Sequence, residues 1–138
     1  MASNTPRPPP EIEEKLKEYK VIEAEVQELF SKKQAILAQL NENTLVQGEL
    51  DMITDEDSKV YKLVGPLLVR VEHEEAKQNV KKRLEFIEGE VKKIEGLIDA
   101  KQSELNEKGK SIQETQQRMQ AEAAEAAKAV AAEVTAGM

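Results

Sequence analysis

The sequence predicts a mainly α-helical protein: a long antiparallel helical hairpin, or coiled coil, with a β-hairpin at its base. Ala, Glu, Lys, Leu and Arg make up about half of the 138 residues and aromatic residues only 3%, a composition typical of long helices. Apolar residues return every three or four positions in two long segments, as on one face of a helix. Between these segments, two short apolar runs flank Gly65-Pro66.

The first ten residues hold four of the five prolines, and we expect residues 1–10 to form a disordered, Pro-rich tail. Pro10 suits the first turn of a helix, because its missing N–H is not needed there. Glu11 and Glu13 then place negative charge at the positive end of the helix dipole. The apolar spacing predicts a helix over residues 11–50. Its expected seam is Ile12, Leu16, Tyr19, Glu23, Val26, Phe30, Lys33, Leu37 and Leu40, widened on one side by Ile22, Leu29 and Ile36.

Residues 59–71 are predicted to form the β-hairpin, because two apolar and β-branched runs flank two turn residues. Gly65 can adopt the positive φ of a type II′ turn, and Pro66 fits the next position. Pairing Val64 with Leu67 then leaves both faces of the hairpin mostly apolar.

A second helix is predicted over residues 72–120, where the spacing alternates between four and three. Its seam is Val80, Leu84, Ile87, Val91, Ile94, Ile98, Lys101, Leu105, Lys108, Ile112, Thr115 and Met119. The Ala-rich residues 121–138 offer little apolar area, and we expect them to be frayed or disordered. If residue 50 lies near residue 72, Ile12 lies near Lys110, and everything beyond about Ile112 overhangs its partner. We therefore expect the free ends of the coiled coil to be loosely packed, with apolar side chains such as Ile112 and Met119 only partly covered.

A lone two-stranded hairpin is marginally stable in water, and both of its edges can pair with further strands. Since no other strand is predicted in the sequence, hairpins of other chains are the simplest partners. The sequence therefore predicts an oligomer held together by a composite β-structure.

Several function classes are disfavoured by composition. The net charge of −7 argues against nucleic-acid binding, which needs a basic face. No segment approaches the roughly 18 apolar residues that cross a membrane, and the N-terminus lacks the apolar core of a secretory signal. The absence of cysteine fits a reducing compartment, so a cytoplasmic location is the default expectation.

The remaining motifs favour structural interpretations. Gly109-Lys110-Ser111 matches the end of a phosphate-binding loop, but Glu104 stands where the motif needs glycine. The Asp-rich segment around Asp51 lacks the spacing and central glycine of a calcium loop. His73 is the only histidine and has no recognisable catalytic or metal-binding partner. We expect no enzyme activity, no cofactor and no metal site.

The hairpin and the helix after it resemble a β-type subunit of the prefoldin family. The resemblance covers residues 11–120 and is most specific in Val60-Tyr-Lys-Leu-Val-Gly-Pro-Leu-Leu-Val69 and in Glu75-Ala-Lys-Gln-Asn-Val-Lys-Lys-Arg-Leu-Glu-Phe-Ile87. A single hairpin between the helices is the β-type pattern.

The resemblance implies a role as well as a fold. Prefoldin is a heterohexameric chaperone of two α-type and four β-type subunits, whose hairpins form a β-barrel platform that carries coiled-coil arms. It binds unfolded or nascent actin and tubulin without nucleotide and delivers them to the group II cytosolic chaperonin. The alternative is a structural coiled-coil scaffold or tether, in which the hairpin is only a spacer.

The resemblance also implies two sets of functional residues. The platform residues are Val60, Tyr61, Leu63, Val64, Gly65, Pro66, Leu67, Leu68 and Val69. The client-binding residues at the free ends of the helices are Ile12, Leu16, Tyr19, Leu105, Ile112 and Met119.

Overall fold

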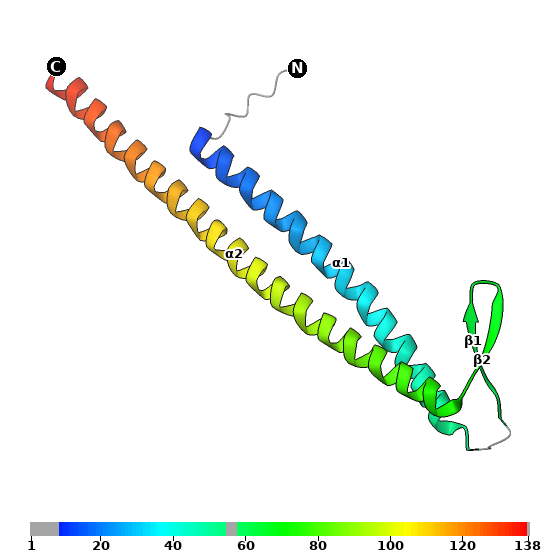
Figure 1. Ribbon diagram of the computed structural model, residues 1–138. Helices are drawn as coiled ribbons and strands as arrows, with labels where there is room; N and C mark the ends of the chain where they lie inside the picture. Colours follow the sequence, from blue (N-terminus) through cyan, green and yellow to red (C-terminus); the bar gives the residue numbers. More distant parts are fainter. Residues whose placement is uncertain (1–8, 55–57, 138) are drawn as a thin grey trace. The chain divides into compact units, whose positions relative to one another are not determined.

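The computed structural model describes residues 9–54 and 58–137. It contains two long helices and one two-stranded antiparallel sheet, which confirms the predicted fold class (Figure 1). The elements are α1 (Pro10–Met52), β1 (Val60–Val64), β2 (Leu67–Val71) and α2 (His73–Ala136). Apart from Pro9 and Pro10, the expected Pro-rich tail lies outside the described residues. No helix in the described ranges has an apolar stretch suited to crossing a membrane.

The chain divides into two compact units. Unit 1 comprises Met1–Gln27 with Asp99–Met138, and unit 2 comprises Glu28–Ile98, which includes the β-hairpin. Within each unit a segment of α1 packs against a segment of α2.

The β-hairpin has the register that the sequence predicts. Val64 pairs with Leu67, Leu63 with Leu68, and the strands close with Val60 opposite Val71. Gly65 adopts a φ of 57°, in the left-handed region that favours glycine. Because proline cannot adopt a positive φ, Pro66 restricts this turn to the expected type II′ geometry.

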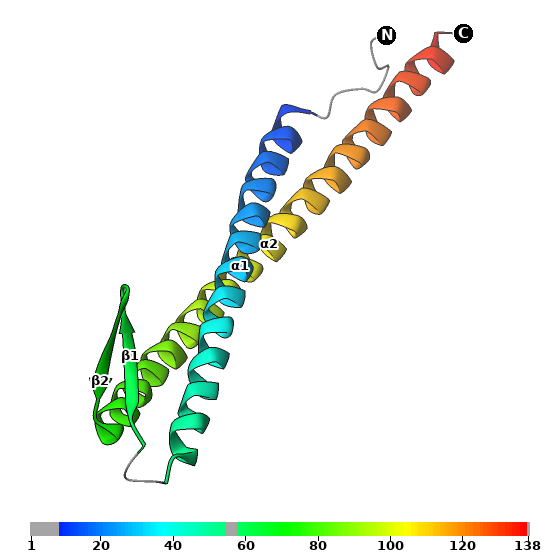
Figure 2. The ribbon, with the colours of Figure 1, turned by 90° about the vertical axis from the view of Figure 1, so that its right-hand side faces the viewer.

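Unit 2 has an aliphatic core that joins the helices to the base of the hairpin. The core is formed by Leu50, Val80 and Leu84, with Leu40, Ile53, Val60 and Ala76 packed against it. The Nε2 atom of His73 lies 2.7 Å from the backbone oxygen of Leu50. The first turn of α2 is thereby linked to the end of α1, beside the hairpin (Figure 2).

The seam of α2 is the predicted one. On α1, six of the nine predicted seam residues are buried or half-buried, but Glu23, Phe30 and Leu37 are exposed, and their neighbours in the adjacent column, Ile22, Leu29 and Ile36, take their places. Ile22 is buried, and Leu29 and Ile36 are half-buried. Phe30 and Leu37 are 37% and 39% exposed and flank the interface instead of forming its centre. Both columns contain apolar residues at helical spacing, so spacing alone does not distinguish them. Packing against a single partner helix buries the more continuous aliphatic column.

In unit 1 the helices are paired in a different register from the expected one. Glu11 contacts Arg118, and Lys15 contacts Thr115 and Ser111, so the neighbours of Ile12 lie about one to two helical turns beyond Lys110. A matching offset occurs in unit 2, where Asp51 pairs with Lys77. Leu50 does lie near the start of α2, at His73, but the core packs it with Val80, and this packing sets the register further along α2.

Helix α2 continues to Ala136, past the end expected near residue 120. The side chains of residues 121–136 are exposed, and tertiary packing does not hold this segment in place. Its Ala and Glu residues have high intrinsic helix propensity, which accounts for the continuation.

Candidate functional site

The β-hairpin presents apolar side chains on both faces. On one face Leu63 and Leu68 are 68% and 69% exposed, and on the other Val64 and Leu67 are exposed to a similar degree. Single chains in water rarely expose large contiguous apolar surfaces, and such surfaces mark interaction sites. The hairpin therefore has the properties of an assembly surface.

The edges of the hairpin point to the same conclusion. Among the described residues, β1 and β2 pair only with each other, so each strand keeps one edge with free backbone N–H and C=O groups. Exposed edges of this kind pair with strands of other chains. The expected platform residues all belong to this one element.

A groove of about 360 Å³ lies between the hairpin and the helices of unit 2. It is lined by Val46, Leu50, Val60, Tyr61, Lys62, Leu63, Val71, Ala76, Asn79, Val80 and Arg83. The core residues Leu50 and Val80 form one side of the groove, and the hairpin forms the other. An apolar side chain of a partner strand would extend the core here.

The six residues expected to bind clients all lie in unit 1, but they differ in accessibility. Ile12 and Ile112 are only 6% and 8% exposed, because they pack between the helices. The other four, Leu16, Tyr19, Leu105 and Met119, are half-buried. The expectation that Ile112 is partly uncovered is wrong for this reason: the shifted register places a turn of α1 over it.

A polar layer that the sequence analysis missed crosses unit 1. The ammonium group of Lys15 donates to Ser111 Oγ at 2.9 Å and to Thr115 Oγ1 at 2.7 Å. Thr115 is buried, and its hydroxyl also donates to the backbone oxygen of Ser111. One signal for this layer is visible in the sequence, since the polar residue Thr115 stands at a seam position. A buried polar residue in such a seam needs a partner from the facing helix.

Three ion pairs accompany this layer in unit 1. Glu11, Glu18 and Glu25 are seven residues apart on α1, and they contact basic residues of α2. The pairs are Glu11–Arg118 at 2.8 Å, Glu18–Lys108 at 2.9 Å and Glu25–Lys101 at 2.6 Å. The hydrogen bond with Glu25 raises the pKa of Lys101, and the hydrogen bond with Glu18 raises that of Lys108.

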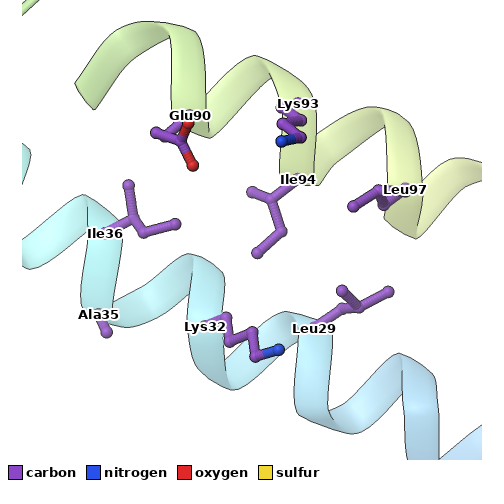
Figure 3. Close-up of a pocket in the computed structure, with 8 residues that line it drawn as sticks. All are labelled: Leu29, Lys32, Ala35, Ile36, Glu90, Lys93, Ile94 and Leu97. Atoms are coloured by element: carbon purple, nitrogen blue, oxygen red, sulfur yellow. The ribbon is translucent and has the colours of Figure 1, made fainter. Parts of the chain in front are cut away.

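Unit 2 carries a shallow apolar groove of about 390 Å³ along its helix pair. Leu29 and Ile36 of α1 face Leu97 and Ile94 of α2, with charged residues around them (Figure 3). The charged residues are Lys32, Glu90 and Lys93.

Side chains that commonly bind metal ions do not gather at any point in the described ranges. No cluster of three or more His, Asp or Glu side chains there could hold a metal ion. Gly109, from the phosphate-loop-like motif, lies within α2, and a β-carbon there would be 3.6 Å from the ring of Tyr19. That is an ordinary van der Waals contact, so Gly109 lies against the aromatic ring within the helix pair.

Comparison with known proteins identifies the family and the fold. A family model described as "Prefoldin subunit" matches residues 13–126. A probable prefoldin subunit 6 of Caenorhabditis briggsae is 42% identical over 115 residues, covering 81% of this chain and 89% of the relative. Human prefoldin subunit 6 is 32% identical over 109 residues, covering 79% and 84%. The crystal structure of the prefoldin beta subunit from Thermococcus strain KS-1 superposes with a TM-score of 0.73 at 24% identity, covering 78% of this chain and 93% of that one.

Proposed function

The chain belongs to the prefoldin family, whose members are chaperone subunits rather than enzymes, and we propose that it acts as a β-type subunit in a heterohexamer with α-type and other β-type prefoldin subunits. In this proposal its hairpin pairs with the hairpins of those subunits to form a shared β-platform. The observation that carries the proposal is the apolar surface on both faces of a two-stranded sheet with free edges.

We further propose that unit 1 contacts unfolded or nascent proteins, with actin and tubulin as clients, and that the complex passes them to the group II cytosolic chaperonin in the cytoplasm. The half-buried Leu16, Tyr19, Leu105 and Met119 support this role, because partly covered apolar side chains give weak contacts that suit a client without fixed shape. Several arms acting together would raise avidity without new contacts on any one arm. No nucleotide is required in this scheme.

Assembly is tested by replacing Leu67 and Leu68 with lysine. Because both side chains are exposed in the isolated chain, the helices should fold normally while co-purification with the other prefoldin subunits is lost. The matched control replaces Leu45 and Phe86 with lysine. These two apolar residues on the helices are about as exposed as the hairpin leucines, and their replacement should leave assembly intact. If the hairpin variant still assembles, the hairpin is a spacer and a coiled-coil tether is the better description.

Client contact is tested separately with Leu105→Ser and Met119→Ser. The double variant should suppress actin aggregation more weakly than the wild type, while native mass spectrometry still detects the hexamer. Val130→Ser with Val134→Ser, on an exposed part of the same helix, is the control and should change neither property. Unchanged suppression in the first variant would place the client site elsewhere.

A further inference from the structure

The β-hairpin has a one-sided charge pattern. Lys62 in β1 and Arg70 in β2 are the only charged side chains of the two strands, and both are cations. The register places Lys62 on the face that carries Val64 and Leu67, and Arg70 on the face that carries Leu63 and Leu68. Each apolar face therefore presents one positive charge. Within the described residues, neither cation forms an ion pair in its own chain.

Pairing through β1 with a second copy of this chain would place like charges together. Lys62 is the central residue of β1, which spans Val60–Val64. Two copies paired antiparallel along the whole of β1 would bring Lys62 directly opposite Lys62 of the second copy. Like charges at directly opposite positions destabilise a strand pair.

Pairing through β2 has a similar consequence. In a full-length antiparallel pair of two β2 strands, which span Leu67–Val71, Arg70 lies opposite Leu68 of the other copy. The two Arg70 side chains then become diagonal neighbours on one face, still within reach of each other. Both edges thus disfavour a second copy, although their apolar residues favour association.

We propose that the hairpin edges accept strands of a different chain that carries Asp or Glu opposite Lys62 or beside Arg70, and that these two cations select the partner. The apolar side chains supply the area that drives association, and the cations determine which strand is accepted. This inference rests on the proposed assembly role of the hairpin and adds the chemistry of the partner strand to it.

The first experiment reverses the two charges in the full chain. A tagged Lys62→Glu, Arg70→Glu variant should recover at least about fivefold less of the other prefoldin subunits than wild type, since each pair changes from attraction to repulsion. Lys62→Gln with Arg70→Gln should give an intermediate loss, and Lys62→Arg with Arg70→Lys should recover the wild-type amount. Lys82→Glu with Lys92→Glu, two exposed positions on α2, changes the net charge equally and should have no effect.

The outcomes separate this inference from the proposed function. If Leu67→Lys with Leu68→Lys abolishes assembly but Lys62→Glu with Arg70→Glu does not, the assembly role holds and selection by charge is overturned. If neither variant affects assembly, both proposals are overturned.

A second measurement uses only this chain. Wild type mixed with Lys62→Glu, Arg70→Glu should form mixed oligomers in native mass spectrometry at concentrations where each chain alone remains monomeric. Added salt should weaken the mixed species. Equal self-association of the wild type and of the mixture would overturn the inference.

Discussion

The helix pairs of the two units follow the same seam pattern but differ in what they bury. In unit 2 the interface buries a nearly continuous aliphatic series that includes Leu84, Ile87 and Ile94. In unit 1 the buried aliphatic residues share the interface with a polar layer of Lys15 and Thr115. Three interhelical ion pairs lie beside the interface in unit 1, and two in unit 2. The same helical period can therefore accompany an almost wholly aliphatic interface in one region and a partly polar interface in another.

The energetic difference follows from the magnitudes of these interactions. Burying a large aliphatic side chain contributes about 1.5–3 kcal/mol, whereas an exposed ion pair contributes about 1 kcal/mol or less. Helix segments with few buried apolar contacts open at a lower free energy than the rest of a chain. Unit 1 should therefore open locally before unit 2 does.

The largest expected effect comes from a cavity in unit 2. Leu84→Ala should lower the free energy of unfolding by about 2–5 kcal/mol, because Leu84 belongs to the buried core. Leu105→Ala in unit 1, at a half-buried seam position, should cost less than half as much. Urea unfolding of the two variants measures the difference, and equal losses would remove the contrast between the units.

Converting the polar layer to an apolar one should make unit 1 more like unit 2. Lys15→Met combined with Thr115→Val removes the ammonium group and the buried hydroxyl together. The third member of the layer, Ser111, loses its donor but is only half-buried. Such replacements are often neutral or stabilising. We expect the free energy of local opening of unit 1, measured by amide hydrogen exchange, to rise by about 1 kcal/mol. Thr115→Val alone should destabilise unit 1, because Lys15 loses an acceptor at 2.7 Å. A loss of protection in the double variant would show that the layer stabilises the pair.

High pH should weaken unit 1 selectively. The pKa values of Lys101 and Lys108 are raised above 10.5 in the folded chain by hydrogen bonds with Glu25 and Glu18. A group with a raised folded pKa contributes its full stabilisation below the unfolded pKa and loses it as the pH rises through the folded value. Stability should therefore fall above pH 10.5, and the fall should be smaller in a Lys101→Met, Lys108→Met variant.

The melting temperature, followed by circular dichroism below and above pH 10.5, measures this loss of stability. Lys92→Met with Lys93→Met is the control, since neither lysine forms an ion pair in the described part of the chain. An identical pH dependence in all three proteins would contradict the assigned role of the ion pairs.

The smallest expected effects concern glycines in unit 2. Gly89 and Gly96 lie within α2, and a β-carbon at either position meets no atom within 4 Å. Substitution by alanine should stabilise the helix by up to about 1 kcal/mol each. Gly65→Ala should instead destabilise the hairpin by about 1–2 kcal/mol, because its φ of 57° is strained for alanine. Thermal melts of the helices and exchange of the hairpin amides distinguish the two effects.

How much of this structure is predictable from sequence depends on the strength of the local signal. The hairpin register follows from Gly65-Pro66, because only one turn geometry suits that dipeptide. The α2 seam is also predictable, since its spacing alternates between four and three throughout, even where Lys101, Lys108 and Thr115 occupy seam positions. On α1 two adjacent columns are apolar, and the choice between Phe30 and Leu29 depends on packing that spacing does not reveal.

The helix register in unit 1 was less predictable for a related reason. It depends on which residue of α2 packs beside the end of α1, and the spacing does not specify that residue. An error of about one to two turns was enough to leave Ile112 uncovered in the prediction, although it is buried in the structure. It also concealed the contact between Lys15 and Thr115, whose members are far apart in sequence.

We propose that the β-hairpin is incomplete in the isolated chain and is completed by strands of other prefoldin subunits. Hydrogen exchange of the amides in β1 and β2, compared between the isolated chain and the assembled complex, gives the sharpest test. We expect rapid exchange at the outer edges in the isolated chain and at least about a hundredfold slower exchange in the complex, because free edge groups become paired there. Equal exchange rates in the two states would rule this completion out.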